Sequence, residues 1–172
     1  MLYYEAFGME PALSLDADEL KKRFYERSRQ WHPDKFSRAS TAEQDKALEM
    51  TAVLNDAFRT LRDPIARTEY FLKENGIELS KEAPPELLEE VFELNMALEE
   101  LRDGDDSARP QLIAARDRFV AMRGEIDEAL QSASVRYDAS KDAVVLDEIR
   151  ASLNRRRYIR NLIREVENVL PN

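Results

Sequence analysis

The chain has 172 residues, of which 43% are hydrophobic and 35% are charged. This length suits one or two domains, and the apolar content is enough for a packed core, which disfavours a disordered chain. Only four glycines are present, and scarce glycine with abundant charge favours long helices over sheets. The net charge of −9 disfavours a general nucleic-acid-binding role, because an acidic protein repels phosphate.

The absence of cysteine excludes disulfides, zinc ribbons and cysteine-ligated iron–sulfur clusters. No apolar run is long enough to span a bilayer, and the N-terminal residues lack the basic and apolar regions of a signal peptide. We therefore expect a cytoplasmic protein with no membrane segment, no metal site and no cofactor.

The first quarter of the chain predicts two helices. Residues 2–8 form a short apolar cluster that ends at Gly8. A second helix is expected to start at Asp16, which has capping-box spacing with Glu19, and to end before Pro33. Its apolar stripe is Leu20, Phe24 and Trp31. Arg27 falls on the same stripe, and its aliphatic stem is expected to lie along the core edge.

A third helix is expected to follow a loop at residues 37–40. Thr41 and Gln44 have capping-box spacing, and Asp63-Pro64 stops the helix. Apolar residues recur at three and four positions, as in an amphipathic helix: Ala47, Met50, Leu54, Ala57, Phe58 and Leu61. A fourth helix, residues 65–75, is expected to end at Gly76.

Residues 77–85, which end in Ala83-Pro84-Pro85, are the predicted linker between domains 1–76 and 86–172. The first 76 residues carry 12 basic and 14 acidic side chains, net −2, whereas residues 77–172 carry 14 and 21, net −7. Helices are expected over 85–103, 107–133 and 141–170. The predicted inward residues are Leu112, Ala115, Phe119, Met122, Ile126, Ala129, Val145, Ile149, Leu153, Ile159, Ile163, Val166 and Leu170. Short connections favour an antiparallel three-helix bundle, and hence an all-α protein of two domains.

The tripeptide His32-Pro33-Asp34 is the most informative motif. Pro33 fixes a backbone angle and breaks the helix, which holds the imidazole and the carboxylate at the tip of a helical hairpin. Such groups engage arginine and backbone groups of a partner through charge-assisted hydrogen bonds. The alternatives are an incidental turn, a metal ligand or a catalytic pair. No second histidine, activated nucleophile or phosphate-binding glycine loop supports the last two, so we expect no enzyme.

A basic face accompanies this motif on the second helix. With the apolar stripe buried, Lys22 and Arg29 point away from the core, and Lys21 and Arg23 flank them. On an acidic protein, such a face either steers an acidic partner or is merely solvated.

The segment Trp31-His32-Pro33-Asp34-Lys35 between two paired helices resembles the J domain of the DnaJ-type co-chaperones, over residues 2–75. The resemblance implies docking to an HscA- or DnaK-type ATPase chaperone and allosteric stimulation of its ATP hydrolysis. The chaperone-binding residues that it implies are His32, Pro33, Asp34, Lys35, Lys21, Lys22 and Arg29.

The whole chain resembles, more narrowly, the HscB family, whose members assist iron–sulfur cluster assembly. The matching motifs include Tyr3-Tyr4-x-x-Phe7-Gly8 and Arg67-x-Glu69-Tyr70. The chain differs from general-purpose DnaJ, because it has neither a Gly/Phe-rich segment nor a CxxC module. The resemblance implies that an apolar, acid-ringed patch binds a cluster-scaffold protein. The matching residues are Leu88, Phe92, Glu93, Met96, Glu100 and Tyr158. Glu89 and Met96 depart from the family pattern.

The alternative for this patch is that Leu88, Phe92 and Met96 face the bundle core. The fuller apolar stripe on the same helix is Leu87, Val91, Leu94, Leu98 and Leu101. At the level of function, the alternatives are a J-domain protein with another client and a helical structural adaptor that oligomerises through its bundle. The oligomeric state is open, and a monomer is expected.

Five arginines cluster on the last helix: Arg155, Arg156, Arg157, Arg160 and Arg164. They either bind an anion or pair with carboxylates of neighbouring helices, and we expect the pairing.

Overall fold

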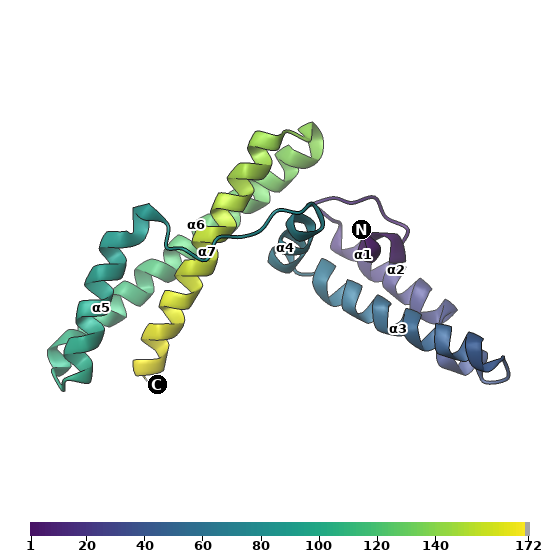
Figure 1. Ribbon diagram of the computed structural model, residues 1–172, viewed down its shortest axis with the longest axis horizontal. Coiled ribbons are helices and arrows are strands. Elements are labelled where there is room, and N and C mark those ends of the chain that lie inside the picture. The colour runs from purple at the N-terminus through teal and green to yellow at the C-terminus, as the bar shows by residue number, and fades with distance from the viewer. Residues whose placement is uncertain (171–172) are drawn as a thin grey trace. The chain divides into compact units, whose positions relative to one another are not determined.

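A computed structural model describes residues 1–170 and divides the chain into two compact units between Glu78 and Leu79 (Figure 1). The described residues form helices and connecting segments without a strand, so the all-α class is confirmed. None of the helices over residues 1–170 combines the length and apolarity needed to cross a membrane.

The N-terminal unit is built on a helical hairpin with two short flanking helices. Its elements are α1 (Leu2–Ala6), α2 (Ala17–Gln30), the 3-10 helix η1 (Pro33–Phe36), α3 (Thr41–Leu61) and α4 (Pro64–Glu74). Helices α2 and α3 lie side by side, and α1 packs against α3 (Figure 1). Phe24 of α2 stacks on Phe58 of α3, with ring centroids 4.3 Å apart. The buried side chains that join these helices include Tyr4, Phe7, Leu20, Ala47, Leu54, Ala57 and Leu61.

Asp16 begins α2, but the reciprocal capping box predicted with Glu19 is wrong. The Asp16 carboxylate accepts hydrogen bonds from the backbone N–H groups of Asp18 and Glu19, each at 2.9 Å. The Glu19 carboxylate instead accepts from Nε of Arg23 at 2.7 Å. An i, i+4 arginine therefore takes the carboxylate that would have reached back to the cap.

The capping box of α3 lies one residue earlier than predicted. The Ser40 hydroxyl accepts from the Glu43 backbone N–H at 3.3 Å, and the Glu43 carboxylate accepts from the Ser40 backbone N–H at 2.9 Å. Gln44 donates instead to the carbonyls of Ser37 and Ala39. Two overlapping cap patterns stand in the sequence, and the path of the preceding turn selects Ser40.

A buried arginine ties three segments of the N-terminal unit together. Arg67 of α4 is 8% exposed. Its Nε donates to the carbonyl of Leu13 at 2.8 Å, and a terminal nitrogen donates to the carbonyl of Leu61 at 2.7 Å. These carbonyls belong to the loop before α2 and to the end of α3, so one side chain joins α4 to both segments. The apolar periodicity of α4 does not predict this role.

The C-terminal unit is a bundle of three helices with two short 3-10 turns. Its elements are η2 (Pro85–Leu87), α5 (Leu88–Arg102), η3 (Asp106–Ala108), α6 (Arg109–Ser140) and α7 (Ala143–Val169). Helices α6 and α7 form a long antiparallel pair, and α5 packs beside the N-terminal part of α6 (Figure 1). Most of the predicted inward residues are buried, from Leu112 and Phe119 to Ile163 and Val166.

Two predictions for α6 are wrong. The helix continues to Ser140, seven residues beyond the expected end, and stops where Lys141 adopts a left-handed conformation with φ 54°. Ala129 is exposed, and Leu130 is buried in its place. A straight α-helix turns every 3.6 residues, so a strict seven-residue register drifts away from the core along a long helix.

The connecting segment is fastened to the C-terminal unit within the predicted linker range. The Ser80 backbone N–H donates to Oδ1 of Asn154 in α7 at 2.7 Å. The Ser80 hydroxyl in turn accepts from the Glu82 backbone N–H. The domain boundaries taken from the sequence stay predictions.

Replacement of Arg67 by methionine is expected to lower the free energy of unfolding of the N-terminal unit by about 2–4 kcal/mol. The change removes the two buried hydrogen bonds that the Arg67 guanidinium donates to the carbonyls of Leu13 and Leu61. Urea titration followed by circular dichroism measures the effect. The matched control is Arg59→Met, whose side chain is exposed on α3 and for which a change within about 0.5 kcal/mol is expected. Equal effects of the two substitutions would contradict the role assigned to Arg67.

Candidate functional site

The segment between α2 and α3 breaks the helical hydrogen-bond pattern and then starts a new turn. The Trp31 backbone N–H still donates to the carbonyl of Arg27, at 3.1 Å, and closes α2. His32 then adopts an extended conformation, φ −60° and ψ 128°, as the residue before proline requires. Residues 33–36 form a 3-10 turn rather than an open loop, so the tripeptide is part of a defined structure.

His32 caps this turn with its own imidazole. The Asp34 backbone N–H donates to Nδ1 of His32 at 3.3 Å, and the Lys35 backbone N–H donates to the His32 carbonyl at 2.9 Å. Because Nδ1 accepts, the hydrogen-bond pattern assigns the proton of the neutral ring to Nε2. The ring therefore offers an N–H donor on the side that faces away from the turn.

The side chains of His32 and Asp34 at this tip are both open to solvent. The side chain of His32 is 59% exposed and that of Asp34 is 92% exposed, with Nδ1 and Oδ2 3.5 Å apart. A donor and an anionic acceptor thus stand beside the rigid ring of Pro33. Such a pair suits recognition of arginine and backbone groups of another protein.

Aromatic stacking fixes the base of the tip. The rings of Trp31 and Phe36 stack with centroids 5.9 Å apart and an angle of 6° between their planes. The ammonium of Lys46, on α3, lies 5.7 Å from the Trp31 ring centroid, and the Thr51 hydroxyl lies 3.3 Å from the Trp31 carbonyl oxygen. The sequence analysis missed Lys46 and Thr51, because only the pairing of α2 with α3 brings them to the turn.

The predicted basic face of α2 is largely available. The side chains of Lys21, Lys22 and Arg29 are exposed, and Lys35 is exposed at the tip. The guanidinium of Arg23, by contrast, makes hydrogen bonds within the N-terminal unit. Besides Glu19, it donates to the carbonyls of Phe7 and Gly8 at 3.1 and 2.9 Å.

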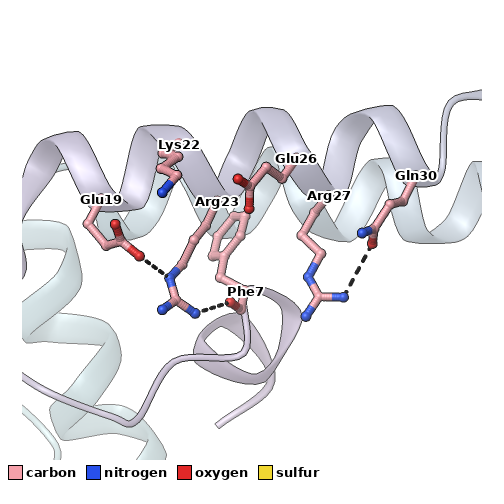
Figure 2. Close-up of a pocket in the computed structure, with 7 residues that line it drawn as sticks. All are labelled: Phe7, Glu19, Lys22, Arg23, Glu26, Arg27 and Gln30. Carbon is pink, nitrogen blue, oxygen red and sulfur yellow. Dashed lines mark hydrogen bonds and ion pairs between the residues drawn. The ribbon is translucent and has the colours of Figure 1, made fainter.

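A polar pocket of about 390 Å³ lies between α2 and the end of α1 (Figure 2). Arg27 points into it and donates to Oε1 of Gln30 at 3.3 Å. Gly8 has φ 62°, and a Cβ there would stand 3.1 Å from the Arg27 guanidinium, so this turn needs glycine. The pocket is lined by Phe7, Glu19, Lys22, Arg23, Glu26, Arg27 and Gln30.

The C-terminal unit presents an apolar patch on α5. Leu88, Phe92 and Met96 are 56%, 65% and 48% exposed, whereas the alternative stripe supplies the core through Leu87, Leu94 and Leu98. The prediction that the first three residues face outward is confirmed. The acidic side chains of Glu89, Glu93 and Glu100 are exposed on the same helix. Tyr158 is half-buried on α7, and within residues 1–170 no hydrogen bond or ring contact joins it to α5.

The arginine cluster of α7 divides into two groups. Arg155 lies 3.7 Å from a carboxylate oxygen of Glu86, and Arg156 makes a two-point contact with the Asp127 carboxylate of α6. The expected pairing is confirmed for these two. In the part of the chain that the structure describes, Arg157, Arg160 and Arg164 lie within ion-pair distance of no carboxylate.

The described residues also contain no group of three or more histidine, cysteine, aspartate or glutamate side chains arranged to hold a metal ion. The predicted chaperone-binding and scaffold-binding residues lie on two surfaces of different chemistry. The tip of the helical hairpin in the N-terminal unit is polar and charged, and the α5 patch in the C-terminal unit is apolar with acidic neighbours.

Comparisons with known proteins match both units. The DnaJ domain model matches residues 2–70, and the HSCB C-terminal oligomerisation domain model matches residues 83–167. Two curated relatives, co-chaperone protein HscB homologs from two strains of Vibrio vulnificus, are each 39% identical over 111 residues. These alignments span 62% of this chain and 65% of the relatives' own length.

Solved structures are similar over almost the entire chain. The chaperone HscB from Vibrio cholerae has a TM-score of 0.66 and 30% identity, and the match covers 98% of this chain and 97% of that one. The human co-chaperone protein HscB has a TM-score of 0.69 and 26% identity, with coverage of 96% and 80%.

The capping box that starts α3 is expected to stabilise the helix in a pH-dependent way through the Glu43 carboxylate. Hydrogen bonds from the Ser40 hydroxyl, and then from its backbone N–H, lower the pKa of Glu43 below its usual 4.5. The stabilisation is therefore present above the ordinary pKa and is lost as the pH falls through the lowered pKa. In wild type, NMR titration is expected to give a lowered Glu43 pKa. Ser40→Ala removes the hydroxyl but keeps the backbone N–H, so the Glu43 pKa is expected to rise only part of the way towards its usual value. A Glu43 pKa unchanged by the substitution would contradict this cause.

Proposed function

Because the chain belongs to the HscB family of J-domain co-chaperones, we propose that it stimulates the ATPase of an HscA- or DnaK-type chaperone and brings it an iron–sulfur cluster scaffold protein. The observation that carries the proposal is the exposed His32-Pro33-Asp34 tip within a matched DnaJ domain. The protein acts as a binding module, and the ATP chemistry belongs to the partner.

The tip supports a two-point contact with the chaperone. Nε2–H of His32 donates to an acceptor, and the Asp34 carboxylate accepts from a cationic or backbone donor. Pro33 and the Trp31–Phe36 stack limit the freedom of these groups before binding, which lowers the entropic cost of association. Contacts that form in only one conformation of the chaperone shift its equilibrium, by about 1–3 kcal/mol for typical allosteric coupling.

The basic side chains of α2 extend this contact by long-range attraction. Lys21, Lys22 and Arg29 are exposed on a chain whose net charge is −9. A localised positive face on an acidic protein orients its approach to an acidic partner surface, and salt screens the attraction.

The α5 patch is the proposed scaffold-binding surface. Leu88, Phe92 and Met96 stand in one row along the helix, and Glu93 and Glu100 provide charge at its edge. Burial of exposed apolar side chains supplies affinity, and the acidic rim favours a partner with basic groups around an apolar contact. We assign Tyr158 to the same surface from the family resemblance.

A second candidate is a helical adaptor that assembles through its C-terminal unit. The description of the matched family model, which names an oligomerisation domain, favours this candidate. It does not exclude the co-chaperone role, because the two activities use different units.

His32→Gln is expected to abolish most of the stimulation of single-turnover ATP hydrolysis by the chaperone. Glutamine keeps a polar side chain but replaces the imidazole at the tip. Asp45→Asn, on the exposed side of α3, is the matched control and should stimulate as wild type does. Equal stimulation by His32→Gln and wild type would overturn the proposed mechanism.

Leu88→Ala/Phe92→Ala is expected to weaken binding to a purified iron–sulfur scaffold protein by about 2–4 kcal/mol, because two exposed apolar anchors are truncated. Isothermal titration calorimetry measures the change. The control is Val135→Ala/Val144→Ala, which truncates two other exposed apolar side chains, 57% and 72% exposed, outside α5. Unchanged binding by the first pair would show that the scaffold or the surface is wrongly assigned.

A further inference from the structure

The base of the His32-Pro33-Asp34 tip receives a contact from α3 that the proposed function leaves unused. The ammonium of Lys46 lies 5.7 Å from the centroid of the Trp31 ring. Trp31 is the C-cap residue of α2, whereas Lys46 lies in the second turn of α3. The other two cation–π contacts within residues 1–170 join side chains four residues apart, at the C-terminal ends of α3 and α6. The Lys46–Trp31 contact, by contrast, forms only when the two arms of the hairpin pair.

The Lys46 ammonium has no competing partner. Its side chain is exposed, and in the described part of the chain no carboxylate lies within ion-pair distance of it. Glu43, three residues earlier, uses its carboxylate in the cap of α3. The Thr51 hydroxyl also approaches Trp31, but it lies 2.8 Å from the Ala47 carbonyl oxygen of its own helix and 3.3 Å from the Trp31 carbonyl oxygen. Lys46 is therefore the α3 side chain whose polar group is directed to Trp31 alone.

The Trp31 ring transmits this contact to the tip. Trp31 directly precedes His32, and Phe36 ends the 3-10 turn that starts at Pro33. The Trp31 and Phe36 rings stack almost in parallel, at 5.9 Å and 6°, so they bridge the two ends of the tip. Both rings are only half-buried, so few neighbours hold them in place. A restraint on Trp31 is thus also a restraint on the turn that carries the imidazole and the carboxylate.

We propose that Lys46 is a positioning residue: its ammonium holds Trp31 against Phe36 and so keeps His32 and Asp34 in the arrangement that the chaperone binds. The contact itself can be tested alone, and its effect on the chaperone rests on the proposed function. A cation over a partly exposed indole shifts a conformational equilibrium about two- to fivefold. The apparent dissociation constant rises as the binding-competent arrangement becomes less populated. Loss of Lys46 should therefore raise the concentration needed for stimulation and leave the stimulation at saturation unchanged.

Titration of the chaperone's single-turnover ATP hydrolysis with the full chain tests this split. Lys46→Met keeps a long apolar side chain but removes the charge, and it should raise the half-maximal concentration about two- to fivefold at an unchanged plateau. Lys46→Arg should restore the wild-type value, because a guanidinium also binds over an aromatic ring. Lys73→Met, at an exposed position of α4, makes the same change in net charge and should match wild type. Wild-type behaviour of Lys46→Met, or an equal loss in Lys73→Met, would overturn the proposal.

A double-mutant cycle separates positioning from a direct contact between Lys46 and the chaperone. Trp31→Leu removes the ring and should itself raise the half-maximal concentration. In that background Lys46→Met should have no further effect, because the ammonium no longer has a ring to hold. If Lys46→Met has the same effect in both backgrounds, Lys46 acts on the chaperone directly and the positioning role is refuted.

NMR of the full chain tests the contact without any chaperone. Trp31 is the sole tryptophan, so its indole N–H gives a single signal. Lys46→Met should lower the heteronuclear NOE of this group and of the backbone amides of residues 34–36, since both become more mobile on the fast timescale that this measurement reports. Lys46→Arg and Lys73→Met should keep the wild-type values. Unchanged values in Lys46→Met would refute the proposal, even if Trp31→Leu is too unstable for the cycle.

The two kinds of measurement also separate this inference from the proposed function. A wild-type chain that stimulates no chaperone, together with a mobile Trp31 in Lys46→Met, would overturn the co-chaperone role and support the Lys46 contact. Stimulation by wild type, together with an unchanged Trp31 signal and an unchanged half-maximal concentration in Lys46→Met, would keep the co-chaperone role and overturn the positioning role.

Discussion

The interruption of helical hydrogen bonding after Trp31 is the constraint on which the geometry of the His32-Pro33-Asp34 tip depends. Pro33 has no N–H and restricts the residue before it, so α2 ends and the chain turns towards α3. The turn is rigid because His32 caps it and because Trp31 stacks on Phe36 at its base. An uninterrupted helix would leave the imidazole and the carboxylate along a helix surface, without this fixed relation to each other.

The rest of the N-terminal unit holds the two arms of the hairpin together. Phe24 and Phe58 stack between α2 and α3, and Arg67 fastens α4 to the end of α3 and to the loop before α2. Arg23 of α2 fastens the end of α1 by donating to the carbonyls of Phe7 and Gly8. Two arginines in a strongly charged protein thus serve the fold by satisfying carbonyl groups, which separates them from the exposed cations that we assign to chaperone binding.

The C-terminal unit divides the apolar residues around α5 between its core and its surface. Leu94 and Leu98 of α5 enter the core together with Leu87 of η2, while Leu88, Phe92 and Met96 stay in solvent. Exposed apolar rows of this kind are typical of interaction surfaces, because burial of the same side chains in the core would stabilise the fold.

The sequence by itself determined the helical class, the order of the helices and the position of the His32-Pro33-Asp34 tip, because these follow from local periodicity, proline and composition. It left open which side of α5 is buried, since both stripes of that helix are apolar. Only the tertiary structure decided which stripe is buried. It also selected the Ser40–Glu43 cap and extended α6 to Ser140. It brought Lys46 and Thr51 to Trp31, and Arg67 to the carbonyl of Leu61. These features depend on contacts between residues distant along the chain, and local patterns carry no information about which distant group will be near.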